Sequence, residues 1–218
     1  EIAEKLGYLS KGWLKKAKDS FKKTSDVKNK YKTHYYFNYI GGWHEQAEGV
    51  IFGDWSEGKT DSVLPYVYAL DWGYSPDPLA MVRVAVDKKQ KLIYVKEMIY
   101  ETEIDDVAAR FKAIGVTKKD LIICDTNEPR TRKSLKNLGY NITNALKEKI
   151  VEDIREIKNY KLIIDPDSPN LKTELNNYVW NDKKSQSIPI DAFNHSLDAM
   201  SYGYRRIVNG KRRIISMN

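Results

Sequence analysis

The chain has 218 residues, of which 41% are hydrophobic and 31% charged, a composition typical of one globular domain of ordinary size with a smaller appendage. No stretch reaches the roughly 18 consecutive apolar residues of a membrane span, and the first residues lack the basic-then-apolar pattern of a secretion signal. The single cysteine, Cys124, excludes an internal disulfide and fits a reducing compartment, so we expect a protein that is not secreted and has no membrane partner.

The net charge of +7 is concentrated at the start of the chain. Residues 1–34 contain ten lysines against four acidic residues, whereas the other 184 residues together carry only +1. Sparse apolar positions in residues 1–34 predict one or two polar helices that connect to a larger domain. Such a basic helical connector suits a polyanionic partner such as DNA, and a solvated lysine-rich helix face explains it equally well.

Residues 35–60 are rich in aromatic residues and glycine, which predicts loops and short extended pieces packed on the main domain. Within them, residues 53–60 match the phosphate-loop pattern of nucleotide-binding proteins letter for letter. That mechanism needs a helix that begins at Lys59 and Thr60 and directs its N-terminus at the phosphates. Because Pro65 and a strand pattern follow, the sequence leaves no room for this helix, and nucleotide binding becomes the least favoured interpretation.

From residue 66 onward, the hydrophobic periodicity predicts regular elements. Three strands come first, and helices then alternate with strands. This order predicts an α/β fold over residues 35–218, in which a mixed central sheet is flanked by helices on both faces. Strands are predicted at 66–71, 79–86, 91–100, 121–125, 140–145 and 162–165, and helices at 103–114 after a Thr102 cap, 130–138 after Pro129, 149–158, 169–180 with an extended end, and 192–207.

Two of the predicted strands end on an aspartate, Asp71 and Asp125. A carboxylate at the end of a buried strand is costly to desolvate without a partner, and loops at strand ends line the functional edge of a mixed sheet. A third aspartate, Asp198, lies on the last predicted helix. Three carboxylates in one place repel one another unless their pKa values rise or a cation binds. The alternative is that Asp71 and Asp125 serve as turn or cap residues and that Asp198 is an exposed helical aspartate.

Oxygen-only ligands select hard cations, Mg²⁺ or Mn²⁺, over zinc. Two such ions roughly 4 Å apart can activate water and stabilise the leaving oxygen in phosphodiester hydrolysis. The three aspartates therefore predict a metal-dependent nuclease. We find no recognition-helix motif for reading bases, so cutting is expected to show little sequence specificity.

The last predicted helix places a histidine beside the third aspartate. His195 and Asp198 are three residues apart and share a neighbouring helix face, where His195 could orient a ligand or act on a phosphate or water. A surface histidine is the simpler alternative. Asp191 follows Pro189 and is predicted to cap this helix, with metal binding as a second possibility. The core stripe of the helix is predicted at Phe193, Leu197, Met200 and Tyr204.

Weaker candidates surround the three aspartates. Asp77 and Glu128 could support the acidic site, but Asp77 sits in a proline-rich turn pattern and Glu128 precedes a predicted helix, where an acidic residue favours the helix start. Arg130 and Arg132 follow the second aspartate closely and could contact the DNA backbone.

Four segments together resemble one family. Residues 70–74 with Asp77, residues 123–129, and residues 194–199 with Tyr202 look like the three acidic motifs of phage large-terminase nuclease domains. Residues 39–55 are similar to the segment that leads into that domain. Asn194 stands where a second aspartate is frequent in the family, and Lys147 matches a lysine often found there, which could approach a phosphate.

The resemblance implies a ribonuclease H-like fold and an endonuclease that cuts concatemeric viral DNA during genome packaging in the host cell cytoplasm. It implies that Asp71, Asp125 and Asp198 bind Mg²⁺ or Mn²⁺. The implied partners are double-stranded DNA, the portal, the small terminase subunit and the packaging ATPase domain, for which we find no counterpart here. Alternatives are another ribonuclease H-like nuclease, such as a junction resolvase or a transposase-like enzyme, and a non-catalytic module that docks on the portal.

Overall fold

The computed structural model describes residues 49–60, 63–73, 77–146, 149–181 and 188–210. The predicted connector at 1–34, its boundary with the domain and Lys147 lie outside these ranges. From Val50 onward, the described residues belong to one compact unit. Of the helices that can be described, none is long and apolar enough to cross a membrane.

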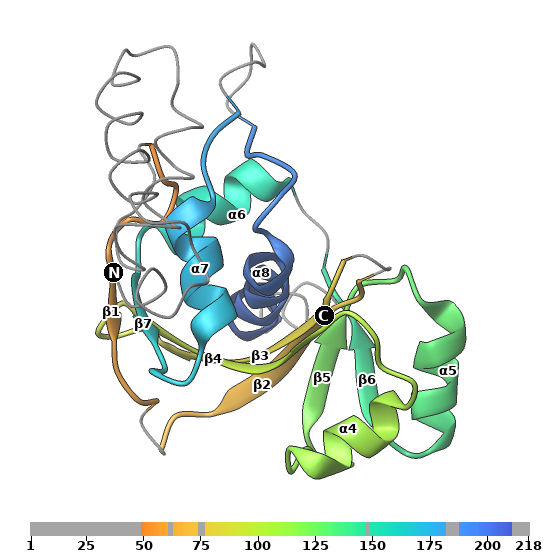
Figure 1. Cartoon of the computed structure of the whole chain (residues 1–218). Helices are drawn as coiled ribbons and strands as arrows, with labels where there is room; N and C mark the ends of the chain where they lie inside the picture. Colours follow the sequence, from red (N-terminus) through yellow and green to blue (C-terminus); the bar gives the residue numbers. More distant parts are fainter. Residues whose placement is uncertain (1–48, 61–62, 74–76, 147–148, 182–187, 211–218) are drawn as a thin grey trace, which may run out of the picture. The chain divides into compact units, whose positions relative to one another are not determined.

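A seven-stranded mixed sheet forms the centre of this unit, in the order β1-β7-β4-β3-β2-β5-β6 (Figure 1). β3 pairs antiparallel with both β2 and β4, and the four other pairs are parallel. The predicted mixed sheet is thus confirmed. The strands are β1 Trp55–Glu57, β2 Tyr66–Asp71, β3 Leu79–Asp87, β4 Leu92–Glu101, β5 Leu121–Cys124, β6 Asn141–Asn144 and β7 Lys161–Ile164; the helices are α4 Val107–Ala113, α5 Pro129–Asn137, α6 Ile150–Ile157, α7 Pro169–Asn177 and α8 His195–Asn209.

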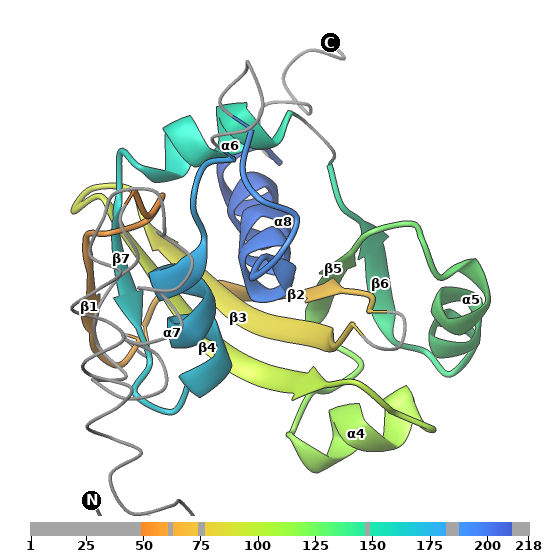
Figure 2. The same ribbon diagram turned by 45° about the horizontal axis from the view of Figure 1, so that its top comes forward.

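Helices cover both faces of the sheet, as the sequence predicted. Because side chains alternate along a strand, Val67 and Ala69 of β2 face the side that α6, α7 and α8 cover. Ile123 of β5 faces the same side. Tyr68 and Leu70 point to the opposite side, where α4 and α5 pack. Figures 1 and 2 show α8 lying across the sheet on the first of these faces.

A glycine lets α8 approach the sheet closely. A Cβ added at Gly203 would lie 2.8 Å from Cγ2 of Val84 and 3.2 Å from Cβ of Ala69. Leu197, Met200 and Tyr204 of the predicted stripe are buried on this side. The helix therefore rests directly on β2 and β3, and its position follows that of the strands.

The start of α8 differs from the prediction. Phe193, expected in the core stripe, is 39% exposed and has a positive φ of 56°, a left-handed conformation that a helix cannot include. The helix consequently begins at His195 with Asn194 in the cap position, not at 192. Asp191 is exposed and does not cap α8, so that prediction is wrong.

The start of α4 also differs. It begins at Val107, and the carboxylate of Asp106 accepts a hydrogen bond from the backbone N–H of Ala109 at 3.0 Å. Asp106 therefore caps the helix instead of Thr102. The other elements begin and end within about three residues of their predicted bounds.

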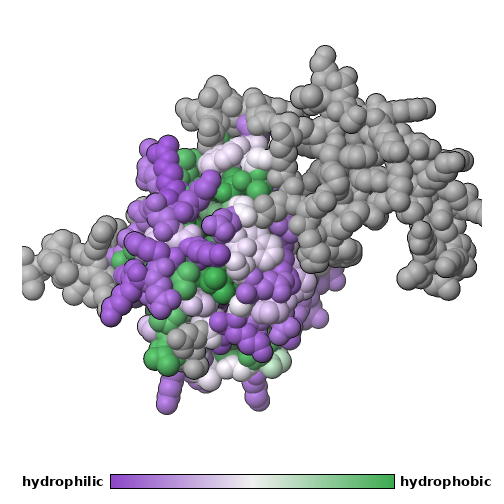
Figure 3. Space-filling model, turned by 90° about the vertical axis from the view of Figure 1, so that its left-hand side faces the viewer, coloured by the Kyte–Doolittle hydropathy of each residue, from purple (hydrophilic) through white to green (hydrophobic). Residues whose placement is uncertain are grey.

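The phosphate-loop pattern has a different structure from the one that nucleotide binding needs. Its centre forms β1, and the N–H of Gly58 donates to the carbonyl of Ile164 at 2.9 Å. No helix occurs among the described residues between Thr60 and β2. β1 is a short strand at the sheet edge, and Figure 3 shows mainly hydrophilic residues on that side of the molecule.

Candidate functional site

Asp71 and Asp125 lie side by side because of the sheet register. β2 and β5 are parallel neighbours, and the register pairs Leu70 with Cys124. Asp71 is the last residue of β2 and Asp125 follows β5 directly. Both continue the alternation that points to α8, because Ala69 and Ile123, two residues earlier, pack on that side. The side chain of Asp71 is 13% exposed and Asp125 is buried.

His195 stands between two carboxylates. Its Nδ1 lies 3.4 Å from Oδ2 of Asp71, and its Nε2 lies 3.7 Å from Oδ1 of Asp77. The hydrogen bond with Asp71 is the main cause that raises the pKa of His195, and the charges of Asp71, Glu174 and Asp77 add to it. Burial opposes this rise. The imidazole therefore keeps its proton more readily than a free histidine.

Asp198, one turn into α8, is half-buried. Burial is the largest cause that raises its pKa to about 7, and the negative charges of Asp71 and Glu174 raise it further. The side-chain amide of Asn194 donates to Oδ2 of Asp198 at 3.2 Å. Asn194 thus supplies a donor to its neighbour.

All three aspartates influence the hydroxyl group of Tyr202 on α8. Its hydroxyl donates to Oδ1 of Asp71 at 3.5 Å. Burial is the first cause that raises the pKa of Tyr202, and the charges of Asp71, Asp198 and Asp125 follow in that order. These three carboxylates, far apart in the sequence, act on one hydroxyl group.

The side chains that the structure describes are not arranged as a complete set of metal ligands. Among the residues that the structure describes, no group of three His, Cys, Asp or Glu side chains is arranged as metal ligands. Asp71, Asp198 and His195 are brought into one electrostatic neighbourhood, and Asp125 is part of the field at Tyr202. A shared metal bound by Asp71, Asp125 and Asp198 stays a prediction.

Glu174 of α7 belongs to this neighbourhood, although sequence reasoning did not select it. It is 1% exposed, and its Oε2 accepts hydrogen bonds from the backbone N–H groups of Ser196 at 2.8 Å and Leu197 at 3.2 Å. Its Oε1 accepts from the hydroxyl of Tyr100 at 3.0 Å. One signal was available: Glu174 lies three residues after Leu171 on a helix, which places an acid on the apolar face.

Of the weaker candidates predicted around the three aspartates, some lie at the site and others do not. Asp77, beside His195, is at the site. Glu128 precedes α5, and its carboxylate accepts from the hydroxyl of Thr131 at 3.2 Å. Exposed Asp191 contributes only the smallest of the charges that raise the pKa of Asp198. Arg132 donates to the side-chain carbonyl of Asn144 and so ties α5 to β6.

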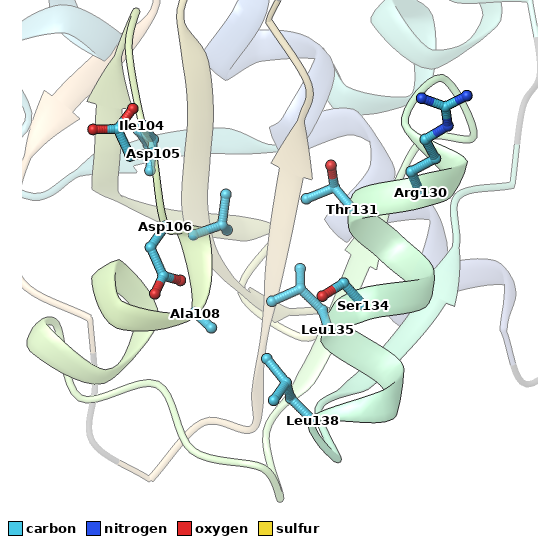
Figure 4. Close-up of a pocket in the computed structure, with 10 residues that line it drawn as sticks. Ile104, Asp105, Asp106, Ala108, Arg130, Thr131, Ser134, Leu135 and Leu138 are labelled. Atoms are coloured by element: carbon cyan, nitrogen blue, oxygen red, sulfur yellow. The ribbon is translucent and has the colours of Figure 1, made fainter.

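A cavity lies elsewhere, between α4 and α5. It has a volume of about 390 Å³, and its lining mixes apolar and polar side chains. Figure 4 shows Leu135 of α5 and Leu138, which directly follows the helix, pointing toward α4, while Arg130 extends away from them at the start of α5. Because both helices pack on the sheet face opposite α8, this cavity is separate from the aspartates.

Comparisons with known proteins agree with this geometry. A family model described as "Terminase RNAseH like domain" matches residues 71–205, from the first aspartate to the last helix. The large terminase subunit of Bacillus phage SPP1 is 28% identical over 219 residues, an alignment that covers 91% of this chain. This chain spans 49% of that relative's length.

Two solved structures have the same fold. The nuclease domain of the SPP1 large terminase, crystallised with bound Mn, has 29% identity and a TM-score of 0.63, and the match covers 73% of this chain and 99% of that one. The P22 large terminase nuclease domain has 16% identity and a TM-score of 0.58, with 72% and 91% covered. The fold is therefore ribonuclease H-like. Because the family model matches well over half of its residues, this chain belongs to the family of terminase RNase H-like domains.

Proposed function

We propose that this chain is a metal-dependent DNA endonuclease, the nuclease domain of a large terminase subunit, which cuts concatemeric viral DNA during genome packaging in the host cytoplasm. One observation carries the proposal: Asp71 and Asp125 end neighbouring parallel strands on the sheet face that α8 covers, and His195 and Tyr202 of α8 contact Asp71. The similarity to the SPP1 large subunit supports it.

The chemistry of the donors fits a hard divalent cation. Asp71, Asp125 and Asp198 offer only carboxylate oxygens, the ligands that Mg²⁺ and Mn²⁺ prefer. Burial and the charge of Asp71 disfavour the ionised form of Asp198, and a cation would relieve both effects. We propose two Mg²⁺ or Mn²⁺ ions held by these aspartates, which supply an activated water and stabilise the leaving oxygen.

Neighbouring side chains orient these aspartates. Tyr202 donates to one oxygen of Asp71, and the ring of His195 lies beside the other. His195, held between Asp71 and Asp77, can keep a proton near the reacting phosphate. The position of Asp71 is thus set from α8 on two sides.

The proposed substrate is double-stranded DNA, with contacts to its backbone and little reading of its bases. Arg130 is exposed near the second acidic motif and is a proposed phosphate contact, together with Lys147. The packaging ATPase domain, the portal and the small subunit are proposed partners. The chain spans about half of the SPP1 large subunit, so the roles of the whole protein are proposals as well.

Plasmid nicking tests the proposal. We expect the wild-type chain to nick supercoiled plasmid in Mn²⁺ or Mg²⁺ but not in EDTA, and Asp71→Asn and Asp198→Asn to lower the rate at least about 1,000-fold. Asp87→Asn is the matched control: Asp87 accepts from the backbone N–H groups of Lys89 and Gln90 in the β3–β4 turn, at the opposite end of the sheet from Asp71.

The same assay separates the alternatives. Near-normal cutting by both aspartate variants would refute the site. A wild-type chain that nicks nothing with either metal would favour a docking module, and a strong preference for branched DNA over linear duplex would favour a resolvase-like nuclease.

A further inference from the structure

The first turn of α8 takes its cap from another helix. The N–H groups in the first turn of any helix lack partners within the helix. Asn194 occupies the cap position, but its side chain makes no capping hydrogen bond; its amide N–H donates to Asp198. Glu174 of α7 accepts from the N–H groups of Ser196 and Leu197 instead. A negative charge at this end also interacts favourably with the helix dipole.

The two capped peptide groups lie between the functional side chains. His195 directly precedes Ser196, and Asp198 directly follows Leu197. A shift of these peptide groups would move His195 away from Asp71 and displace Asp198 with it. The carboxylate of Glu174 is thus bonded to the segment of backbone that sets both positions.

Glu174 is itself held firmly. Its second oxygen accepts from the hydroxyl of Tyr100 on β4. The start of α7 is bound to the same strand, because the carboxylate of Glu97 accepts from the N–H of Leu171 at 2.8 Å and from the amide of Asn170 at 2.7 Å. Hydrogen bonds therefore run from β4 through α7 to α8.

This arrangement has a cost in stability. Glu174 is almost completely buried, and burial raises its pKa to about 7 in spite of the hydrogen bonds that its carboxylate accepts. An apolar residue would avoid the desolvation of a carboxylate. A buried acid whose two oxygens both accept hydrogen bonds fixes geometry in a way that apolar packing does not.

We propose that Glu174 is a positioning residue of the acidic site: by capping the first turn of α8 from α7, it holds His195 and Asp198 in place beside Asp71. The inference rests on the proposed nuclease function for its kinetic consequence. Its structural content, the clamp on the first turn of α8, can be measured without cutting.

Three variants test the inference in the full chain. Glu174→Ala removes the cap, whereas Glu174→Gln keeps an oxygen that can accept from Ser196 and Leu197. Phe111→Leu is the control for stability alone, because Phe111 is buried on the opposite sheet face under α4. Should Glu174→Ala not fold, Glu174→Asp replaces it, since its shorter side chain cannot span from α7 to both N–H groups.

We expect Glu174→Ala to lower kcat in Mn²⁺ about 100-fold with the KM for plasmid nearly unchanged. Amide exchange at Ser196 and Leu197 should accelerate about 10-fold or more, and Mn²⁺ affinity, measured by titration calorimetry, should fall about 10-fold. Glu174→Gln should stay within a few-fold of wild type in all three measurements.

Two results would overturn the inference: wild-type kcat, exchange and Mn²⁺ affinity in Glu174→Ala, or an equal loss of all three in a Phe111→Leu variant of matched melting temperature. If the wild-type chain does not cut plasmid in Mn²⁺, that result contradicts the proposed function and not this inference. In that case, amide exchange and Mn²⁺ binding still decide whether Glu174 holds α8.

Discussion

The imidazole of His195 and the carboxylate of Asp71 meet across 124 positions of the chain, with Nδ1 3.4 Å from Oδ2. The contact joins the first helical residue of α8 to the last residue of β2. Asp77 lies near the other ring nitrogen, so carboxylates flank the ring on both sides. This pairing raises the pKa of His195 and links its protonation to the acidic residue beside it.

Replacing His195 should impair chemistry more than DNA binding. We expect His195→Asn to slow plasmid nicking about 100-fold in saturating Mn²⁺, because a positioned acid or base contributes that order of rate and Asp71 loses its neighbour. DNA affinity in Ca²⁺ should change little. A variant that nicks within a few-fold of the wild-type rate would remove His195 from the site.

The raised pKa of Asp198 predicts a pH-dependent stability without metal. Between about pH 4 and pH 7, folded Asp198 binds more protons than unfolded Asp198, so its contribution to stability falls as the pH rises through this range. Asp198→Asn removes this effect. We expect the variant to gain melting temperature over wild type at pH 8 and to show no such gain at pH 4. An equal difference at both pH values would contradict the raised pKa.

The buried pair of Asp153 on α6 and Arg205 on α8 should couple strongly. Both side chains are nearly inaccessible, and the guanidinium also donates to the carbonyl of Leu146. Asp153→Leu or Arg205→Leu leaves one buried charge uncompensated, for which we expect a loss of about 3–5 kcal/mol in urea unfolding. The double variant should lose less than the sum of the two. Additive losses would mean that the pair does not act as a unit.

The exposed cation Arg130 should contribute to DNA affinity through the phosphates. We expect Arg130→Gln to weaken binding to unrelated duplexes alike and to reduce the slope of log affinity against log salt by about 1. Lys89→Gln removes the same charge from the β3–β4 turn, at the opposite end of the sheet from Asp71, and should change neither quantity. Equal effects of both variants would point to net charge alone.

Strand ends could be predicted from the sequence because their physical signals are local. Asp71 and Asp125 each end a run of apolar residues, and side-chain alternation then fixes the face that they share. Pairing between strands is not local, so the register that aligns Leu70 with Cys124 is known only from the structure. Helix starts are harder to predict from the sequence, because the left-handed conformation at Phe193 is not marked by a residue such as glycine.

The residues that support the acidic site were missed for a related reason. Glu174 and Tyr202 act through contacts with residues 22 and 131 positions away, respectively. No spacing in the sequence shows such contacts. An acid on an apolar helix face was a usable signal for Glu174, whereas Tyr202 entered only as part of a family motif.

The place of α8 in chain order has a consequence for biosynthesis. When translation has passed residue 190, every described strand of the sheet has been synthesised, yet β2 and β3 still expose the valines and alanines that α8 covers. A nascent chain at that stage presents an apolar surface to other molecules. It also lacks Asp198, so under the proposed function it would not yet cleave nucleic acid. Closure of the sheet face and, under the proposed function, completion of the acidic site therefore coincide when α8 docks.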